Sequence, residues 1–164
     1  MEYRRLFVPN TIVFITIVTN NRIPILVQNI DKLEQSVNET KRFFKFEIIA
    51  YAVLKDHIHL LIKPKEITDY PKIVKSIKYN FTVGMAMPTY YKLWQNRYFE
   101  HTIRDEEDLF RHLDYIHYNP VKHYNISPNA WKFSSFKDFV NKEYYDENWC
   151  NSADKHHINT LNYE

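Results

Sequence analysis

The sequence predicts an α+β fold in which a mostly antiparallel sheet is covered by helices, and three observations point to this class. Residues 11–19 are rich in β-branched side chains, which is typical of a central strand buried on both faces. Two apolar runs, residues 46–54 and 57–63, are separated by Lys55 and Asp56 and predict a hairpin. Helical spacing recurs elsewhere, giving the order strand, helix, strand, strand, helix, strand, helix. Consecutive strands joined by hairpins favour antiparallel pairing.

Length and composition suit one globular domain. The chain has 164 residues, of which 45% are hydrophobic and 16% aromatic, enough to bury a core. We expect the domain to cover residues 1–145, and residues 146–164 to form a polar C-terminal tail. The single cysteine, Cys150, excludes an internal disulfide framework and fits a reducing compartment. The beginning of the sequence does not read as a signal peptide, and residues 11–19 are too short to span a bilayer. A cytoplasmic protein with no membrane partner is therefore expected.

Charge is distributed unevenly, although the net charge is only +2. Residues 1–92 hold 14 Lys and Arg against 8 Asp and Glu, whereas residues 93–164 hold the remaining 8 against 12. The first part therefore carries a net +6 and the second a net −4. This asymmetry is compatible with a polyanion lying across the first part, and equally with ordinary solvated surface.

Two helices are expected in the first part. One runs from Asp31 to about residue 44, with an apolar face formed by Leu33, Val37, Thr40, Phe43 and Phe44. The other begins at Asp69 with Pro71 in its first turn, and Gly84 fits the left-handed position that closes it. Its apolar stripe is Ile73, Ile77 and Phe81, and its lysine stripe is Lys72, Lys75 and Lys78. Such a lysine stripe is either a solvated face or a track for phosphates.

The second part of the chain predicts one strand and two helices. Residues 93–104 indicate an irregular turn followed by a strand, and an acidic start at residues 105–108 suits the positive end of a helix dipole. We expect this helix to end at residue 118, because Pro120 stops it and pushes Asn119 towards an extended conformation. A short helix follows over residues 134–140.

His57 and His59 form the most informative motif. In an extended strand their side chains project to the same side, while Ile58 points into the opposite, buried layer. Two imidazoles side by side on a stiff strand provide half of a divalent metal site. A chain with 8 histidines also yields such a pair by chance, so other residues must complete the site.

Asn119 and Tyr115 are the candidates for completing it. They are four residues apart and are neighbours on one helix face if the last turn holds. Asn119 offers an amide oxygen to a metal, and Tyr115 offers a phenol that could attack a metal-bound phosphate. In a chain with 13 tyrosines, amphipathic packing of Tyr115 is the plain alternative.

Several segments resemble the REP-associated tyrosine transposases, a branch of the single-tyrosine transposases. His57-Ile58-His59 is similar to the histidine–hydrophobe–histidine motif of that family, and residues 104–123 are similar to its nucleophile helix. Further matches follow in the expected order: Tyr3-Arg4-Arg5, Trp94-Gln95, Glu100-His101, Ile103-Arg104, Trp131 and Phe133-Ser134-Ser135. The resemblance covers residues 3–139, which is more specific than a lone motif.

The resemblance implies a ferredoxin-like endonuclease and transposase core and a single catalytic domain that recognises DNA hairpins. It implies a metal-dependent enzyme that cuts and transfers single-stranded DNA. In this chain Tyr115 would form a 5′-phosphotyrosine, and His57, His59 and Asn119 would bind Mg²⁺ or Mn²⁺. The residues expected to contact nucleic acid are Arg4, Arg5, Lys75, Lys78, Trp94 and Arg104. Related enzymes include dimers and monomers, and both states stay open.

Two departures from the family pattern are visible. Lys55-Asp56 precedes the first histidine where the family often has Pro plus Asn or Glu, and Tyr124 stands where Gly often follows the Lys-His pair. Neither removes a functional group. Two other functions stay open: a hairpin-binding protein that no longer cleaves DNA, and an unrelated metal-dependent hydrolase with a water nucleophile.

Overall fold

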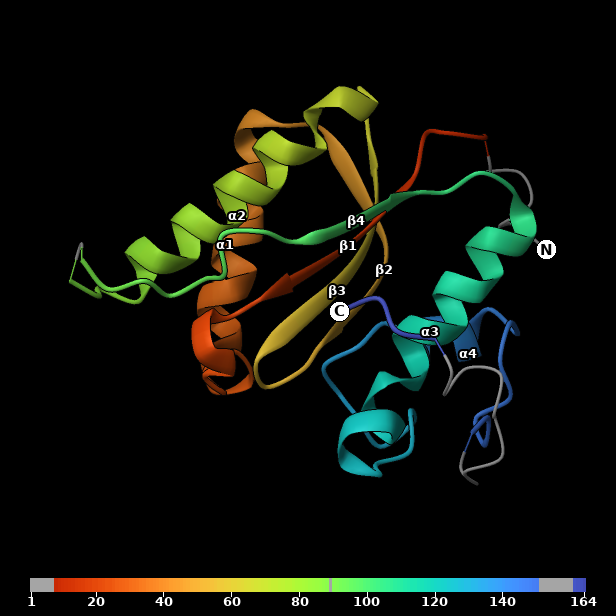
Figure 1. Cartoon of the computed structure of the whole chain (residues 1–164). Helices are drawn as coiled ribbons and strands as arrows, with labels where there is room; N and C mark the ends of the chain where they lie inside the picture. The colour runs from red at the N-terminus through yellow and green to blue at the C-terminus, as the bar shows by residue number, and fades with distance from the viewer. Residues whose placement is uncertain (1–7, 89, 151–160) are drawn as a thin grey trace.

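The structure, a computed structural model, describes residues 8–88, 90–150 and 161–164, and its centre is a four-stranded sheet (Figure 1). The strands are β1 Val13–Val18, β2 Phe46–Val53, β3 His57–Pro64 and β4 Phe99–Thr102. Their order is β2-β3-β1-β4, and every neighbouring pair is antiparallel. With α1 (Ile30–Phe43) after β1 and α2 (Tyr70–Gly84) after β3, this is the ferredoxin-like arrangement. The predicted α+β class is confirmed.

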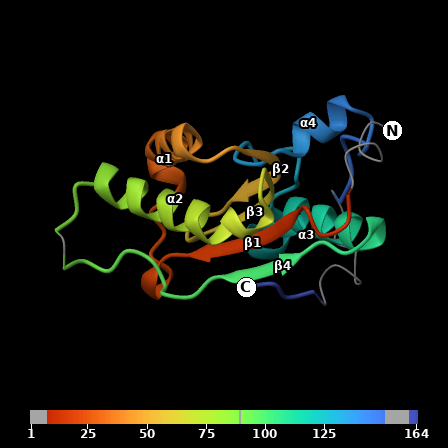
Figure 2. The same cartoon turned by 90° about the horizontal axis from the view of Figure 1, so that it is seen from above.

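Helices cover both faces of this sheet. Helices α1 and α2 lie on one face, and α3 (Glu106–Tyr124) with α4 (Phe136–Asn141) lies on the other (Figures 1 and 2). Among the described residues, three short 3-10 segments connect the elements, at Asn20–Arg22, Val27–Asn29 and Ile67–Asp69. In the described ranges no helix is long and apolar enough to cross a membrane.

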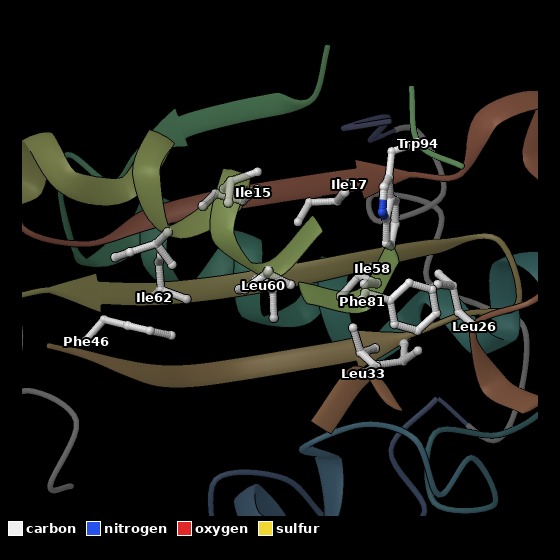
Figure 3. Close-up of a cluster of buried hydrophobic side chains, with 14 of the residues drawn as sticks. Ile15, Ile17, Leu26, Leu33, Phe46, Ile58, Leu60, Ile62, Phe81 and Trp94 are labelled. Atoms are coloured by element: carbon white, nitrogen blue, oxygen red, sulfur yellow. The ribbon is translucent and has the colours of Figure 1, made fainter. Parts of the chain in front are cut away.

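Alternation along the strands divides the core between the two faces. On β1, Val13, Ile15 and Ile17 pack with α1 and α2, whereas Phe14 faces α3. Figure 3 shows the first cluster, in which Ile58 and Leu60 of β3 meet side chains from both helices. All six residues of β1 are buried, as predicted for a strand covered on both sides. The α3 face is the one towards which β3 turns its histidines.

The predicted face of the first helix is wrong at one position. Phe43 is 76% exposed, whereas Leu33 and Thr40 are buried and Phe44 packs against the core. At about 100° per residue, Phe43 is rotated well away from the line through Leu33 and Thr40. Phe44, the extended residue that follows the helix, turns back to the core and leaves Phe43 in solvent.

The predicted role of Gly84 is also wrong. No described glycine has a positive φ, and Gly84 is the last residue of α2. The left-handed residue is Ala86, with φ 51°. The chain turns two residues later than predicted because α2 continues through Gly84, and Met85 N–H still bonds to Phe81 O at 2.9 Å.

Helix α3 does not stop before Pro120, which corrects the predicted end at residue 118. The helix continues to Tyr124, and Asn125 closes it with φ 53°. Pro120 removes one N–H, but its carbonyl accepts from Ile126 N–H at 3.2 Å, and Asn119 and Pro120 are buried. Burial of this turn outweighs the lost hydrogen bond. As a result Asn119 keeps helical geometry and stays on the face of Tyr115.

Candidate active site

Strand β3 holds both histidines against α3. It pairs with β1 on one side and β2 on the other, so that His57 lies opposite Val18 and His59 opposite Thr16. Both imidazoles have 0% exposure, and their ring centroids are 4.9 Å apart. The structure thus brings the two side chains together in a dry environment fixed by strand pairing.

The tautomer of His57 is set by the residue before it. His57 Nδ1 donates to Asp56 Oδ1 at 2.7 Å, so Nε2 carries the lone pair. Within the described part of the chain, no hydrogen bond satisfies this buried Nε2. Burying a polar atom without a partner costs about 1–3 kcal/mol, so the atom is suited to a ligand from outside the chain.

His59 has a polar neighbour at each ring nitrogen, and the two contacts are compatible with its Nε2 acting as a ligand. Nε2 lies 3.1 Å from Asn119 Oδ1, and Nδ1 lies 2.8 Å from Thr16 Oγ1. Thr16 also donates its single proton to Tyr163 O at 2.7 Å. If Nδ1–H donates to Thr16 Oγ1, the Thr16 hydroxyl proton remains available for Tyr163 O. In this tautomer Nε2 has a lone pair, which faces Asn119 Oδ1. Burial, aided by the nearby His57, holds the pKa of His59 well below its usual range, which keeps this imidazole neutral.

Asn119 and Tyr115 are fixed by α3 itself. Asn119 Nδ2 donates to Tyr115 O at 2.7 Å, which turns Oδ1 towards His59. The Tyr115 ring lies edge-on to the His59 ring, with centroids 5.2 Å apart. The predicted pair therefore lies beside His59, whose ring neighbours that of His57. Two imidazole nitrogens and an amide oxygen form a donor set that fits a divalent metal.

The Tyr115 hydroxyl has an electropositive neighbour but a high proton affinity. Lys122 Nζ lies 3.4 Å from Tyr115 Oη and 5.2 Å from its ring centroid. Burial raises the pKa of Tyr115 to about 12, and the N–H of Tyr163, which donates to Oη at 3.2 Å, offsets part of this rise. The phenol is therefore positioned but protonated at neutral pH.

Glu164 lies over the histidines. Its Oε1 is 3.6 Å from His57 Nε2 and 2.6 Å from His123 Nε2, and Lys122 and Arg22 also pair with its carboxylate. Burial alone would raise the pKa of Glu164, but the hydrogen bond from His123 and the electrostatic attraction of the groups around the carboxylate, Lys122 among them, hold it far below its usual range. His57, His59 and Glu164 have ligand atoms within 4.8 Å of one another, as a metal site requires.

The residues predicted to contact nucleic acid are dispersed. Lys75 on α2 and Arg104 before α3 are exposed. Lys78 donates to Gln95 O at 2.8 Å, and Trp94 is 7% exposed, with its indole N–H bonded to Lys78 O, so both hold the connection between α2 and β4. The described residues do not include Arg4 and Arg5.

Sequence reasoning missed four residues of this site: Thr16, Asp56, Lys122 and Glu164. Asp56 directly precedes His57, so the sequence alone could have indicated a carboxylate that orients this histidine. Lys122 follows Tyr115 by seven residues, a helical spacing that the predicted stop at Pro120 concealed. The contacts of Thr16 and Glu164 depend on strand register and on tertiary packing, which leave no local pattern.

Tyr124, the second departure from the family pattern, makes specific contacts in the structure. Tyr124 Oη accepts from Lys55 N–H at 2.9 Å, and Lys55 Nζ lies 4.9 Å from its ring centroid. The end of α3 is thereby attached to the turn that precedes His57. The left-handed residue that a glycine would supply is Asn125 instead.

Comparison with known proteins agrees with this geometry. The family described as "Transposase IS200 like" matches residues 7–119. A REP-associated tyrosine transposase of Escherichia coli is 33% identical, over 91% of this chain and 90% of that protein. A protein of Haemophilus influenzae assigned to the same group is 36% identical, over 93% of this chain and 95% of its own.

A solved structure supports the same relationship. It shows a REP-associated tyrosine transposase bound to a REP hairpin, and it superposes with a TM-score of 0.79 at 31% identity. The match covers 93% of this chain and 92% of the other. Fold, site and sequence together show that the chain belongs to the IS200-like transposases and is a relative of the REP-associated tyrosine transposases.

Proposed function

We propose that this chain is a metal-dependent transposase that cuts and rejoins single-stranded DNA beside a hairpin, with Tyr115 as its nucleophile. The observation that carries the proposal is the position of Tyr115. Its ring touches His59, and Asn119 one turn further along α3 lies 3.1 Å from the same histidine. The hairpin in the related solved structure supports hairpin DNA as the partner.

A divalent metal is the expected cofactor. His57 Nε2, His59 Nε2 and Asn119 Oδ1 would hold it, and the unsatisfied, buried Nε2 of His57 supports this assignment. Two imidazole nitrogens favour Mn²⁺ over Mg²⁺. When bound, the ion would neutralise charge on the scissile phosphate and polarise the phosphorus.

The residues of the chain supply the remaining chemistry. Tyr115 Oη forms a bond to phosphorus as the bond to the 3′ oxygen breaks, which leaves a 5′-phosphotyrosine and a free 3′-hydroxyl. The phenol gives up a proton to solvent and the departing 3′ oxygen takes one up, so the protons balance, and the Lys122 ammonium 3.4 Å from Tyr115 Oη stabilises the negative charge that develops. Because the new bond retains the energy of the phosphodiester, a second 3′-hydroxyl can displace Tyr115 and complete strand transfer.

Two exposed basic residues of the described part of the chain are our candidates for phosphate contacts. Arg104 lies where β4 leads into α3, and Lys75 lies on the outer side of α2. Arg4 and Arg5 remain candidates by sequence. Each such contact should appear as about one unit in the slope of log affinity against log salt concentration.

Substitution of Tyr115 by Phe tests the proposal. The change removes the hydroxyl and keeps the ring, so α3 and DNA binding should be preserved while cleavage is lost. Wild-type protein, incubated with Mn²⁺ and a labelled library of hairpin-containing single strands, should give a protein–DNA band that resists denaturant. The Tyr115→Phe variant should give none. Tyr118→Phe, which removes a hydroxyl from another buried tyrosine of α3, is the matched control and should retain the band.

Two other results would reject the proposal. A Tyr115→Phe variant that still cleaves would show a water nucleophile and favour the unrelated hydrolase. Wild-type protein that binds hairpins selectively, with no cleavage in Mg²⁺ or Mn²⁺, would favour a binding protein.

A further inference from the structure

The ring of Tyr163 lies among aromatic side chains next to the nucleophile. It is nearly parallel to the ring of His112, with centroids 4.7 Å apart, and it stacks on Phe99 at 5.7 Å. Tyr115 and Phe14 meet it edge to face at 4.8 and 5.7 Å. Four aromatic side chains therefore surround one planar ring with the stacked and edge-on geometries that π-systems prefer.

These four side chains belong to the framework of the domain. Phe14 lies on β1, Phe99 on β4, and His112 and Tyr115 on α3. His112 is held by a bond from Nδ1 to Asp108 O at 2.7 Å, and its other face carries the His101 ring, whose centroid is 4.8 Å away. The aromatic site is thus built by β1, β4 and α3, and Tyr163 is its occupant rather than one of its walls.

The residue next to Tyr163 lies where a phosphate is expected. The Glu164 carboxylate is surrounded by His57, His123, Lys122 and Arg22. The backbone between the two side chains bonds to the site as well, because Tyr163 N–H donates to Tyr115 Oη and Tyr163 O accepts from Thr16. An anion and a neighbouring flat ring on one continuous backbone are the features of a nucleotide in a single strand.

From this arrangement we infer that Phe14, Phe99, His112 and Tyr115 form a nucleobase subsite, which takes the base adjacent to the scissile phosphate. The inference rests on the proposed function, since it names where the single strand lies in that site. Residues 163–164 occupy the subsite in the structure, with the Tyr163 ring in the place of the base and Glu164 in the place of the phosphate. Stacking on aromatic side chains is tolerant of sequence, so the subsite fixes the position of the strand and does not read its bases.

Binding of two probes in EDTA, where no cleavage occurs, separates base stacking from phosphate contact. One probe is fluorescein-labelled single-stranded (dT)12, and the other is a strand of the same length made of abasic tetrahydrofuran nucleotides. For each variant, anisotropy titrations give the affinity for (dT)12 divided by the affinity for the abasic strand, and this quotient is the affinity ratio. His112→Ala should lower this ratio by about tenfold, the size of one base–aromatic stack, with affinity for the abasic strand unchanged.

Matched variants distinguish stacking from a structural role. His112→Phe loses the same hydrogen bond to Asp108 O as His112→Ala but keeps a flat ring, so it should retain the wild-type ratio. Phe99→Ala, on the edge strand β4, should reproduce the loss and Phe99→Tyr should not. Thermal melting of each variant confirms folding before titration.

Tyr163 and Glu164 provide the converse test. Tyr163→Ala empties the subsite and should strengthen binding of (dT)12 more than binding of the abasic strand, whereas Tyr163→Phe should change neither. Glu164→Gln removes the negative charge that competes for the phosphate position. It should therefore strengthen the binding of both probes equally. If Tyr163 were only a packing residue, Tyr163→Ala would lower the melting temperature and leave the ratio unchanged.

The outcomes keep this inference apart from the proposed function. Equal ratios in wild type, His112→Ala and Phe99→Ala overturn the nucleobase subsite, even when the protein still forms the Tyr115–DNA adduct. Failure to bind any strand, with no adduct, overturns both.

Discussion

At the scale of single residues, the proposed site depends on groups that orient the expected metal ligands. The carboxylate of Asp56 accepts from His57 Nδ1 and also pairs with Arg22 at 3.1 Å. Burial alone would raise the pKa of Asp56, but these two partners lower it, so the group stays ionised. An ionised acceptor fixes the tautomer and the ring angle of His57, which is the usual arrangement behind a metal-ligating histidine.

Removal of this carboxylate should weaken metal binding. We expect Asp56→Ala to lower Mn²⁺ affinity by about 10–100-fold, because His57 loses its orienting acceptor. Asp56→Asn keeps an amide oxygen in reach of Nδ1 and should lose less. Calorimetric titration measures both, with His57→Ala, His59→Ala as the reference for a destroyed site. Equal affinities of wild type and Asp56→Ala would show that His57 does not need this partner.

The proposed nucleophile, Tyr115, should impose a pH dependence on cleavage. With a pKa of about 12, Tyr115 is almost entirely protonated near neutrality. The phenolate fraction below that pKa rises about tenfold per pH unit, so single-turnover cleavage should accelerate between about pH 6.5 and 8.5. Lys122→Ala should slow the reaction at each pH, and Lys122→Arg should retain most of the rate. A rate that falls as pH rises would contradict Tyr115 as the group that loses its proton.

At the scale of elements, the end of α2 combines two local costs. Ala86 adopts φ 51°, which strains a side chain with a Cβ, while Gly84 lies in helical geometry that needs no glycine. A Cβ added to Gly84 would meet Lys32 Cβ at 3.9 Å, an ordinary contact. Glycine would therefore suit position 86 better than alanine does, and alanine would suit position 84 better than glycine does.

Placing glycine at position 86 and alanine at position 84 should therefore stabilise the protein. Ala86→Gly is expected to raise the free energy of unfolding by about 1 kcal/mol and Gly84→Ala by about 0.5–1 kcal/mol, nearly additively. Urea denaturation checks both, and cleavage should be unchanged because the site lies on the opposite face of the sheet. Ala86→Val is the control in the other direction and should destabilise. No gain from Ala86→Gly would mean that this turn has another conformation.

At the scale of the whole molecule, one chain contains every group of the proposed site. Tyr115 on α3 lies against His59 on β3 of the same chain, and α3 follows β4 through a connection of three residues, 103–105. The turn before His57 is attached to the end of α3 by the bond between Lys55 and Tyr124. These contacts favour a site that works in a monomer, without exchange of tyrosine helices.

A complementation assay tests this arrangement. Tyr115→Phe is mixed with the double variant His57→Ala, His59→Ala. If the site is complete within each chain, the mixture should stay inactive, because neither protein holds both an intact nucleophile and intact ligands. If chains exchanged α3, mixed dimers would contain one intact site and cleavage would return. Co-expression of the two variants allows exchange during folding and serves as the control.

The fold was largely predictable, and the site in part. The two apolar runs in residues 46–63 and the β-branched run before them reflect burial of strands, so β1, β2 and β3 could be derived from the sequence. The ends of α2 and α3 could not, because tertiary burial at Pro120 outweighs its local effect on the helix. His57, His59 and Tyr115 were recognisable by spacing and resemblance. Asn119 was a candidate on the same grounds, whereas the contact of His59 with Thr16 was not recognisable, since strand register brings the two together across 43 positions of sequence.

The position of β3 between two hydrogen-bonded neighbours has a consequence for the hydrogen exchange of its backbone amides. Its amides exchange with solvent only when the pairings with β1 and β2 open, which in a central strand coincides with loss of the whole core. The amides of His57 and His59 should thus be among the slowest to take up deuterium. Their exchange rate reports global stability directly, and the arrangement of the two histidines persists for as long as the protein remains folded.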